Sequence, residues 1–241
     1  MQLSCIAVLP AYNEEETIAR VVEDWNSEFK RLFGDAYRIL VIDDGSRDTT
    51  GAVLDRMVQQ NDKLIVCHQH NQGHGGAVMN GYKQAVGMDT DYVFQTDSDD
   101  QFIAADFDLL WERRKESDFI LGFRQQRHDP LHRIILSKLA ALFIYMLFAA
   151  RMKDSNVPYR LMEKNFLQKL LPLVPERAFA PNICVAIIAA QRKQKLLHIP
   201  VQHRARACGQ SILSKALLKG AIRSFFDLFR LRIELCHEKA H

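Results

Sequence analysis

The segment TDSDDQF, residues 96–102, holds three aspartates in four positions directly after the apolar run YVF. Carboxylates this close repel one another, so a bound cation would lower their free energy. In an extended backbone alternate side chains point the same way, which turns Asp97, Asp99 and Gln101 towards one point. Such oxygen ligands suit Mg²⁺ or Mn²⁺, with water and phosphate oxygens completing the shell. The spacing therefore predicts a divalent metal site, although the segment alone is also typical of a solvated acidic loop.

Two further polar segments follow apolar runs earlier in the chain, LPAYNEEETI at 9–18 and VIDDGSRDTTG at 41–51. Taken alone, the first is typical of an exposed acidic helix start, with Asn13 and Glu16 as a capping box. The second is typical of a β-turn followed by a helix cap at Asp48. Because each segment follows an apolar run, we expect all three at the carboxyl edge of one parallel sheet, where ligands bind.

Short apolar runs alternate with helical patterns through the first half of the chain. The predicted strands are CIAVL (5–9), YRILVI (37–42), KLIVC (63–67), YVFQT (92–96) and DFILG (118–122). Amphipathic helices are expected at 18–32 and near 49–60, 75–87 and 105–116. This alternation predicts an α/β fold with a mostly parallel central sheet flanked by helices. Beyond residue 125 we expect helices near 131–151, 162–172 and 182–191, a strand at 195–201 and a basic helix near 212–235.

Composition and charge narrow the class of protein. A chain of 241 residues with 48% hydrophobic composition buries a substantial core, which argues against intrinsic disorder. Five scattered cysteines without a CxxC pair are typical of a reducing cytosol. We expect no signal peptide, and the uncharged apolar segment 139–150 is short of the roughly 20 residues that span a bilayer. Residues 192–241 carry eleven Lys or Arg against three Asp or Glu, which indicates an anionic partner.

In this order, PAYNEE, DDGS and DSDDQ resemble the motifs of family 2 inverting glycosyltransferases, in particular the dolichol-phosphate mannose synthase branch. The resemblance covers residues 3–125 and continues more weakly to about 212. It implies the nucleotide-diphospho-sugar transferase (GT-A type) fold and Mg²⁺- or Mn²⁺-dependent transfer of a hexose from a donor such as GDP-mannose or UDP-glucose. By position, the resemblance implies that Pro10, Tyr12 and Glu14 line the nucleotide and that Ile42 and Asp44 contact its base and ribose. It further implies that Asp97, Asp99 and Gln101 form the site for the metal and the diphosphate, and that Asp99 is catalytic.

The second half of the chain indicates which kind of group accepts the sugar. Relatives that glycosylate a hydroxyl have an acidic pair serving as general base, and around FAPNICVA (179–186) the only nearby acid is Glu176. A phosphate monoester needs no such base, because its oxygen is already an anion at neutral pH. The missing base therefore favours a polyprenyl phosphate acceptor.

Two arginine-bearing stretches, GFRQQRHDPLHR (122–133) and HRARACGQS (203–211), resemble those of the same branch, and arginine forks suit phosphate oxygens. The resemblance implies that Arg124 and Arg206 are catalytic and that Arg124 also binds the donor. It implies that Arg133, Arg206 and Ser211 bind the acceptor phosphate. The stretch DSNVPYRLM (154–162) departs from the family pattern, with Val157 and Pro158 in place of a Ser-Gly element.

We expect a glycosyltransferase domain over 1–211, with a nucleotide-sugar half to about 125 and an acceptor half over 126–211, and a basic amphipathic helix over 212–241. The segments 131–151 and 215–233 mix apolar and basic residues, as helices on an anionic membrane do, but both patterns also suit helices packed on their own domain. We expect a cytoplasmic protein, peripheral at the inner face of the membrane, with no nucleic-acid partner.

The glycines of HNQGHGGAVMNGYKQA (70–85) stand at a loop-to-helix transition and are assigned to the shape of the site. The neighbouring histidines His68, His70 and His74 show no familiar metal-ligand spacing and are expected at the surface. Two other functions fit the sequence: a glycosyltransferase with a hydroxyl acceptor, and a non-catalytic nucleotide-sugar-binding or membrane-scaffolding protein. A phosphoacceptor domain fits less well, because the segment FILGFR offers arginine where such a domain needs lysine.

Overall fold

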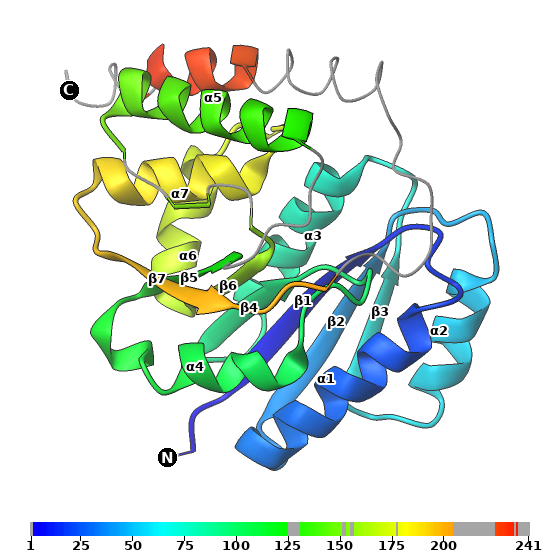
Figure 1. Ribbon diagram of the computed structural model, residues 1–241. Helices are drawn as coiled ribbons and strands as arrows, with labels where there is room; N and C mark the ends of the chain where they lie inside the picture. The colour runs from blue at the N-terminus through cyan, green and yellow to red at the C-terminus, as the bar shows by residue number, and fades with distance from the viewer. Residues whose placement is uncertain are drawn as a thin grey trace.

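The computed structural model describes residues 2–124, 131–150, 153–154, 157–176, 178–204, 225–233 and 235, and of residues 131–138 it describes the backbone. These residues form one seven-stranded sheet (Figure 1) in the order β3-β2-β1-β4-β6-β5-β7. The strands are β1 (Cys5–Ala11), β2 (Tyr37–Asp43), β3 (Leu64–His68), β4 (Tyr92–Thr96), β5 (Phe119–Arg124), β6 (Tyr159–Glu163) and β7 (Leu196–Val201). Only β6 runs antiparallel to its neighbours in this sheet, so the predicted mostly parallel sheet is confirmed.

Strand β6 was not predicted, and it lies in the middle of the sheet between β4 and β5. The expected helix near 162–172 is shorter and starts later. Four of the five residues of β6 are buried, including the side chain of Arg160 at 0% exposure. A strand buried on both faces normally reads as a continuous apolar run, and the arginine after Pro158 and Tyr159 interrupts that pattern.

Helices cover both faces of the sheet. The α-helices are α1 (Ile18–Phe33), α2 (Thr50–Val58), α3 (His74–Gly87), α4 (Phe107–Trp111), α5 (Leu131–Phe148), α6 (Lys164–Leu170) and α7 (Pro181–Gln191). Three short 3₁₀ helices, η1 (Ala104–Asp106), η2 (Arg114–Glu116) and η3 (Leu171–Leu173), complete the set, and η1, α4 and η2 replace the single helix expected near 105–116. One core joins α1, α2 and α4 to the sheet, and a second joins α3, α5, α6 and α7 to its other face.

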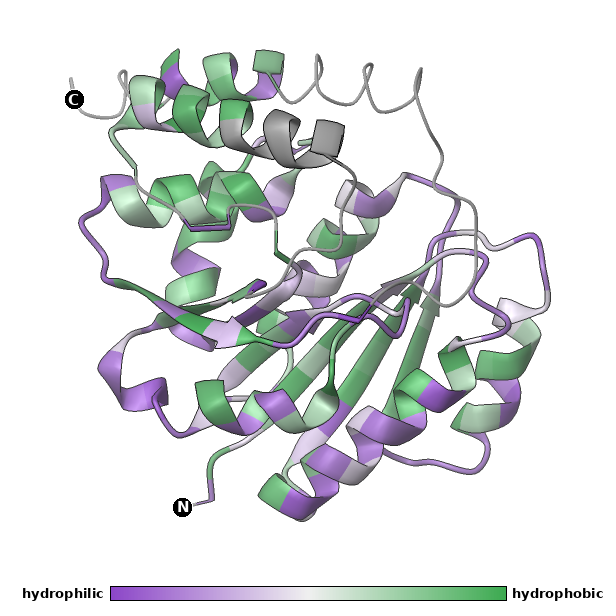
Figure 2. Ribbon diagram, in the orientation of Figure 1, coloured by the Kyte–Doolittle hydropathy of each residue, from purple (hydrophilic) through white to green (hydrophobic). Residues whose placement is uncertain are grey.

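The second face carries two layers of helices. Helix α7 is almost wholly buried and hydrophobic, because it lies between the sheet and α5 (Figure 2). Helical residues 225–233 lie beside α5, where the rings of Phe143 and Phe225 stack with centroids 4.4 Å apart. No helix among the described residues is both long and apolar enough to cross a bilayer.

Helix α3 packs directly on β1 and β2 and thereby points its first turn at the carboxyl ends of the strands. A Cβ at Gly81 would lie 2.3 Å from Val8 Cγ1 and 3.3 Å from Ile42 Cγ1, so only glycine permits this approach. As a result, the start of α3 and the ends of β1, β2 and β4 meet at one edge of the sheet (Figure 1).

Candidate functional site

A cavity of about 370 Å³ opens at this edge of the sheet. Its lining residues come from the ends of β1, β2 and β4 and from the start of α3: Pro10, Ala11, Tyr12, Glu14, Asp44, Asn71, Gly73, His74, Ala77, Asp97, Ser98 and Asp99. Ligands of open α/β sheets bind at such a position. The structure therefore brings six of the residues implicated by the sequence into one cavity: Pro10, Tyr12, Glu14, Asp44, Asp97 and Asp99.

The aspartate segment is fixed by the inward-facing serine between two of its acids. Ser98 is buried, its hydroxyl donates to the carbonyl of Pro10 at 2.8 Å, and its own carbonyl accepts from the Thr17 hydroxyl at 3.3 Å. Asp97 and Asp99 on either side of it line the cavity. Asp100 pairs instead with Arg20 at 2.5 Å, with its backbone in the left-handed region at φ 58°. Two of the three crowded carboxylates therefore face the cavity, and the third pairs with an exposed arginine.

The environment of Asp97 suits a cation. Burial raises the pKa of Asp97, whereas nearby His74, the amide of Gln95 and the guanidinium groups of Arg160 and Arg124 lower it. His74 Nε2 lies 3.8 Å from Asp97 Oδ1, and Gln95 Nε2 donates to the same oxygen at 3.3 Å. A charge that burial disfavours is stabilised by an adjacent positive ion.

A divalent metal fits this donor set as a partly hydrated ion. Asp97 and Asp99 supply hard oxygen ligands, which Mg²⁺ and Mn²⁺ prefer. Among the described residues, no group of three or more His, Cys, Asp or Glu is arranged to hold a metal. Water or diphosphate oxygens would have to complete the shell of the ion, as is usual for Mg²⁺ in phosphate-binding sites.

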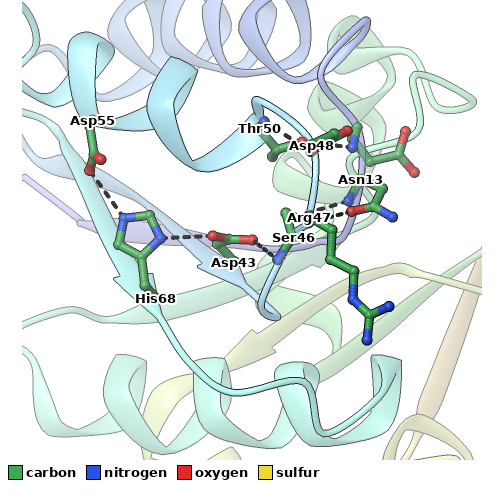
Figure 3. Close-up of polar contacts among 9 residues, drawn as sticks. Asn13, Asp43, Ser46, Arg47, Asp48, Thr50, Asp55 and His68 are labelled. Carbon is green, nitrogen blue, oxygen red and sulfur yellow. Dashed lines mark hydrogen bonds and ion pairs between the residues drawn. The ribbon is translucent and has the colours of Figure 1, made fainter.

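The first and second polar segments are tied to each other (Figure 3). The amide N–H of Asn13 donates to the Ser46 hydroxyl at 3.0 Å, and the amide N–H of Arg47 donates to Asn13 Oδ1 at 2.8 Å. The predicted capping box is wrong, because α1 begins at Ile18 with Thr17 as its N-cap, and Asn13 adopts a left-handed backbone to reach the neighbouring loop. These contacts hold Tyr12 and Glu14 at the cavity wall.

Asp44 is oriented by its neighbours. Its Oδ1 accepts from Gln69 Nε2 at 2.6 Å and from the amide N–H of Gln72 at 2.8 Å, and its own amide N–H donates to the carbonyl of Ala11 at 2.9 Å. The carboxylate is almost completely buried, at 2% exposure. Asp44 is thus a fixed acceptor at the cavity, as a base-reading residue would need to be.

His74 is exposed, as the sequence predicts, with 57% of its side chain accessible, and it also lines the cavity. It is the first residue of α3, and the glycines around it permit its position. Gly73 has φ 80°, and a Cβ at Gly75 would lie 2.5 Å from the carbonyl oxygen of Phe179. The glycine-rich loop-to-helix transition in the sequence is the signal for this position of His74, and it contributes a side chain to the cavity as well as its shape.

Three implicated residues do not line the cavity. Ile42 is fully buried in the core against Gly81. The Gln101 side-chain amide donates to the carbonyl of Arg204 at 3.1 Å. Arg124 binds Asp154, with Nε–Oδ2 at 2.9 Å and a second nitrogen–oxygen contact at 3.3 Å.

The acceptor-side residues Arg206 and Ser211 lie outside the described residues, and of Arg133 only the backbone is described, within α5. A second acid of this half, Asp154, is buried at 4% exposure, and both of its carboxylate oxygens accept hydrogen bonds from Arg124. Glu176, the one acid near FAPNICVA in the sequence, lines a different cavity, together with residues of α3 and η3, Arg230 and Leu235.

A buried polar network supports this side of the site. The Asn182 side chain accepts from the Tyr82 hydroxyl at 2.6 Å and donates to Gln95 at 3.0 Å, and Gln95 in turn contacts Asp97. Arg160 donates to the carbonyls of Val157 at 2.8 Å and Asn182 at 2.5 Å. The buried Arg160 of β6 thus connects α7 and the segment before β6 to the sheet, next to β4, the strand that Asp97 follows.

Comparisons with solved structures show the fold. Glucosyl-3-phosphoglycerate synthase from Mycobacterium tuberculosis, in complex with phosphoglyceric acid, superposes with a TM-score of 0.73 at 18% identity, covering 95% of this chain and 80% of that chain. The same enzyme in complex with Mn²⁺, UDP and glucosyl-3-phosphoglycerate gives a TM-score of 0.72 at 18% identity with the same coverage. The predicted GT-A type fold is confirmed.

Curated relatives include undecaprenyl-phosphate 4-deoxy-4-formamido-L-arabinose transferases. That of Pectobacterium atrosepticum is 28% identical over 207 residues, 85% of this chain and 61% of that protein. That of Pseudomonas fluorescens is 29% identical over 230 residues, 94% of this chain and 64% of that protein. The chain therefore spans about three-fifths of the length of these relatives. The family model "Glycosyl transferase family 2" matches residues 6–174, and the chain belongs to this family.

Proposed function

We propose that the protein is a metal-dependent inverting glycosyltransferase that moves a hexose from a nucleotide diphosphate sugar to a polyprenyl phosphate. The observation that carries this proposal is the cavity in which Tyr12 and Asp44 face Asp97 and Asp99. Family membership supports the reaction class. The complex of glucosyl-3-phosphoglycerate synthase with Mn²⁺ and UDP supports the choice of ligands.

On the donor side, Pro10, Tyr12 and Glu14 are proposed to line the nucleotide, and the fixed carboxylate of Asp44 to accept a base N–H. Asp97 and Asp99 are proposed to hold Mg²⁺ or Mn²⁺. When bound, the ion neutralises the charge that develops on the nucleoside diphosphate as the sugar C1–O bond breaks. Ile42 is proposed to support the nucleotide site from within the core, where it is fully buried. Gln101 is proposed to support the metal site indirectly, by holding its loop to the carbonyl of Arg204.

On the acceptor side, a phosphate oxygen attacks C1 from the face opposite the leaving diphosphate, so the configuration inverts in one displacement. The phosphate acceptor is supported by the names of the curated relatives, which act on undecaprenyl phosphate. It is also supported by the engagement of the buried acid Asp154 with Arg124, because a general base needs a carboxylate directed at the acceptor. Arg133, Arg206 and Ser211 are proposed to bind the acceptor phosphate, with Arg206 also catalytic.

We further propose that the protein contacts the inner face of the membrane through α5 and residues 225–233. One side of the terminal helix packs on the domain through buried Leu228 and Leu231. Its other side exposes Phe226, Phe229 and Ile233, at 65%, 46% and 53%. The division between a domain over 1–211 and a basic helix over 212–241 stays a proposal, and the boundary itself lies outside the described residues. Apolar side chains with nearby arginines suit an anionic lipid interface.

Replacing Phe226, Phe229 and Ile233 together by Ser is expected to lower binding to phosphatidylglycerol-containing vesicles by about tenfold or more, since three apolar anchors are lost. Sedimentation with vesicles measures the bound fraction. A matched control is the pair Val58→Ser and Leu109→Ser, which removes exposed apolar residues from α2 and α4. Equal sedimentation of the triple variant and the wild type would remove this part of the proposal.

The experiment for the function itself is a transfer assay. Radiolabelled UDP- and GDP-linked hexoses are incubated with the protein, Mn²⁺ and either undecaprenyl phosphate or undecaprenol, and the lipid product is extracted. We expect label in the lipid only with the phosphate acceptor and only with metal. Label on undecaprenol would instead establish a hydroxyl acceptor, and donor binding without turnover with any acceptor would establish a binding protein.

A further inference from the structure

An imidazole bridges two carboxylates behind the candidate site (Figure 3). His68, the last residue of β3, places Nδ1 2.7 Å from Asp43 Oδ2 and Nε2 3.1 Å from Asp55 Oδ1. The Asp43 side chain at the end of β2 is 6% exposed, and the Asp55 side chain on α2 is 65% exposed. His68 therefore joins β2, β3 and α2 next to the loop that follows β2.

A short chain of hydrogen bonds leads from this bridge to the cavity wall. Asp43 uses its other oxygen, Oδ1, to accept the amide N–H of Ser46 at 3.0 Å. The Ser46 hydroxyl accepts the amide N–H of Asn13 at 3.0 Å. Asn13 stands between Tyr12 and Glu14, which line the cavity, and Asp43 directly precedes Asp44, which lines it too. These hydrogen bonds connect Asp43 to both segments that line the cavity.

We propose that His68 is a positioning residue for nucleotide binding, which holds Asp43 and, through Ser46 and Asn13, the cavity wall at Tyr12 and Glu14. This inference rests on the proposed function, since it assigns His68 a part in donor binding. His68 does not itself line the cavity. It acts through Asp43, so its loss weakens nucleotide binding and leaves the metal ligands in place.

The bridge depends on the charge of the ring. Both ring nitrogens face carboxylates, and only the imidazolium can donate from both. Among the described residues, the charged groups in contact with the ring are Asp43 from β2 and Asp55 from α2. Gly51 of α2 also lies beside the ring, where a Cβ would be 3.5 Å from His68 Cε1, and it carries no charge.

The hydrogen bond to Asp43 raises the pKa of His68 above its ordinary value of 6.5, and the contact with Asp55 raises it further. A raised folded-state pKa means that the bridge is fully present below pH 6.5 and is lost as the pH rises through the raised value. Above this pKa the neutral ring keeps a single N–H for two carboxylates and no longer attracts Asp43 by its charge, so its hold on Asp43 weakens and nucleotide binding is expected to weaken with rising pH.

The test is calorimetric measurement of the Kd for UDP and for GDP, with saturating Mg²⁺, from pH 6.0 to 8.5. For the wild type we expect the Kd of the bound nucleotide to rise by at least about fivefold across this range, the lower end for coupled sites. For His68→Gln we expect only the pH dependence that protonation of the nucleotide itself gives, with a Kd at high pH equal to the weak, high-pH value of the wild type. Protonation of the nucleotide is common to all variants and cancels in the comparison.

Two further variants sharpen the result. His70→Gln makes the same change at an exposed histidine two residues away and should keep the wild-type profile. Asp55→Asn removes one of the two acids from an exposed position, so it should shift the midpoint of the profile to lower pH even if His68→Gln does not fold.

Parallel profiles for His68→Gln and the wild type, or an unshifted midpoint in Asp55→Asn, would overturn the positioning role while donor binding stands. Absence of UDP and GDP binding by the wild type across the whole pH range would instead overturn the proposed function. The two failures are thus distinguishable.

Discussion

Asp99→Asn is expected to leave the protein folded and to lower metal-dependent sugar transfer by about 10²–10³-fold, the range for loss of one group that stabilises transition-state charge. Asparagine keeps the Oδ1 that accepts the amide N–H of Gln101 at 3.2 Å, so the loop retains that hydrogen bond. It loses the negative charge that is proposed to bind the metal. The initial transfer rate as a function of Mn²⁺ concentration, together with thermal melting, measures both effects.

The matched control is Asp100→Asn, the same change one residue along. Asp100 pairs with Arg20, whose side chain is 55% exposed, and asparagine tolerates the left-handed backbone of this position. Exposed ion pairs contribute little to stability, so we expect near wild-type transfer. If Asp99→Asn transferred sugar at the wild-type rate with the same Mn²⁺ dependence, Asp99 would not be a metal ligand.

Arg124→Ala is expected to impair the protein in two separate ways. The Asp154 side chain, 3% exposed, would lose its guanidinium partner, and breaking a buried pair costs about 3–5 kcal/mol of folding free energy. We further propose that Arg124, which does not line the cavity in this structure, contacts the bound donor as the resemblance implies, so transfer should also fall by about 10²-fold. Urea denaturation measures the free energy of unfolding, and the transfer assay measures the rate.

The double variant Arg124→Ala/Asp154→Ala separates the two effects. The double variant removes the buried carboxylate together with its guanidinium partner, so we expect much of the lost stability to return. The transfer rate should stay low, since the donor contact is still missing. Recovery of the rate together with stability would show that Arg124 serves the fold and takes no part in catalysis.

The parallel half of the fold could be predicted because its signals are local. Each of β1 to β5 is a short, nearly continuous apolar run, and the spacing of Ile18, Val21, Val22 and Trp25 predicted the buried side of α1. Polar segments after parallel strands meet at one edge of the sheet, and the cavity contains residues from the segments that follow β1, β2, β3 and β4.

Long-range contacts limited what the sequence could predict. Arg160 can be buried because it donates hydrogen bonds to carbonyls of α7 and of the segment before β6. Its charge makes the sequence of this core strand typical of a polar segment. The sequence predicts Asn13 as a helix cap, but its side chain accepts a hydrogen bond from the loop after β2, which is a contact between two loops. His74 reaches the cavity because Gly75 and Gly81 let α3 approach its neighbours, and neither approach is visible in local periodicity.

Calorimetric titration of the wild-type protein with GDP-mannose, UDP-glucose and their nucleoside diphosphates, first with Mn²⁺ and then with EDTA, tests the central claim most directly. We predict that one of the two nucleotides binds in the presence of Mn²⁺ and that EDTA abolishes this binding, because Asp97 and Asp99, which line the cavity, are proposed to hold the metal that binds the diphosphate. Binding that is unchanged by EDTA, or no binding of either nucleotide, would contradict a metal-dependent nucleotide-sugar site.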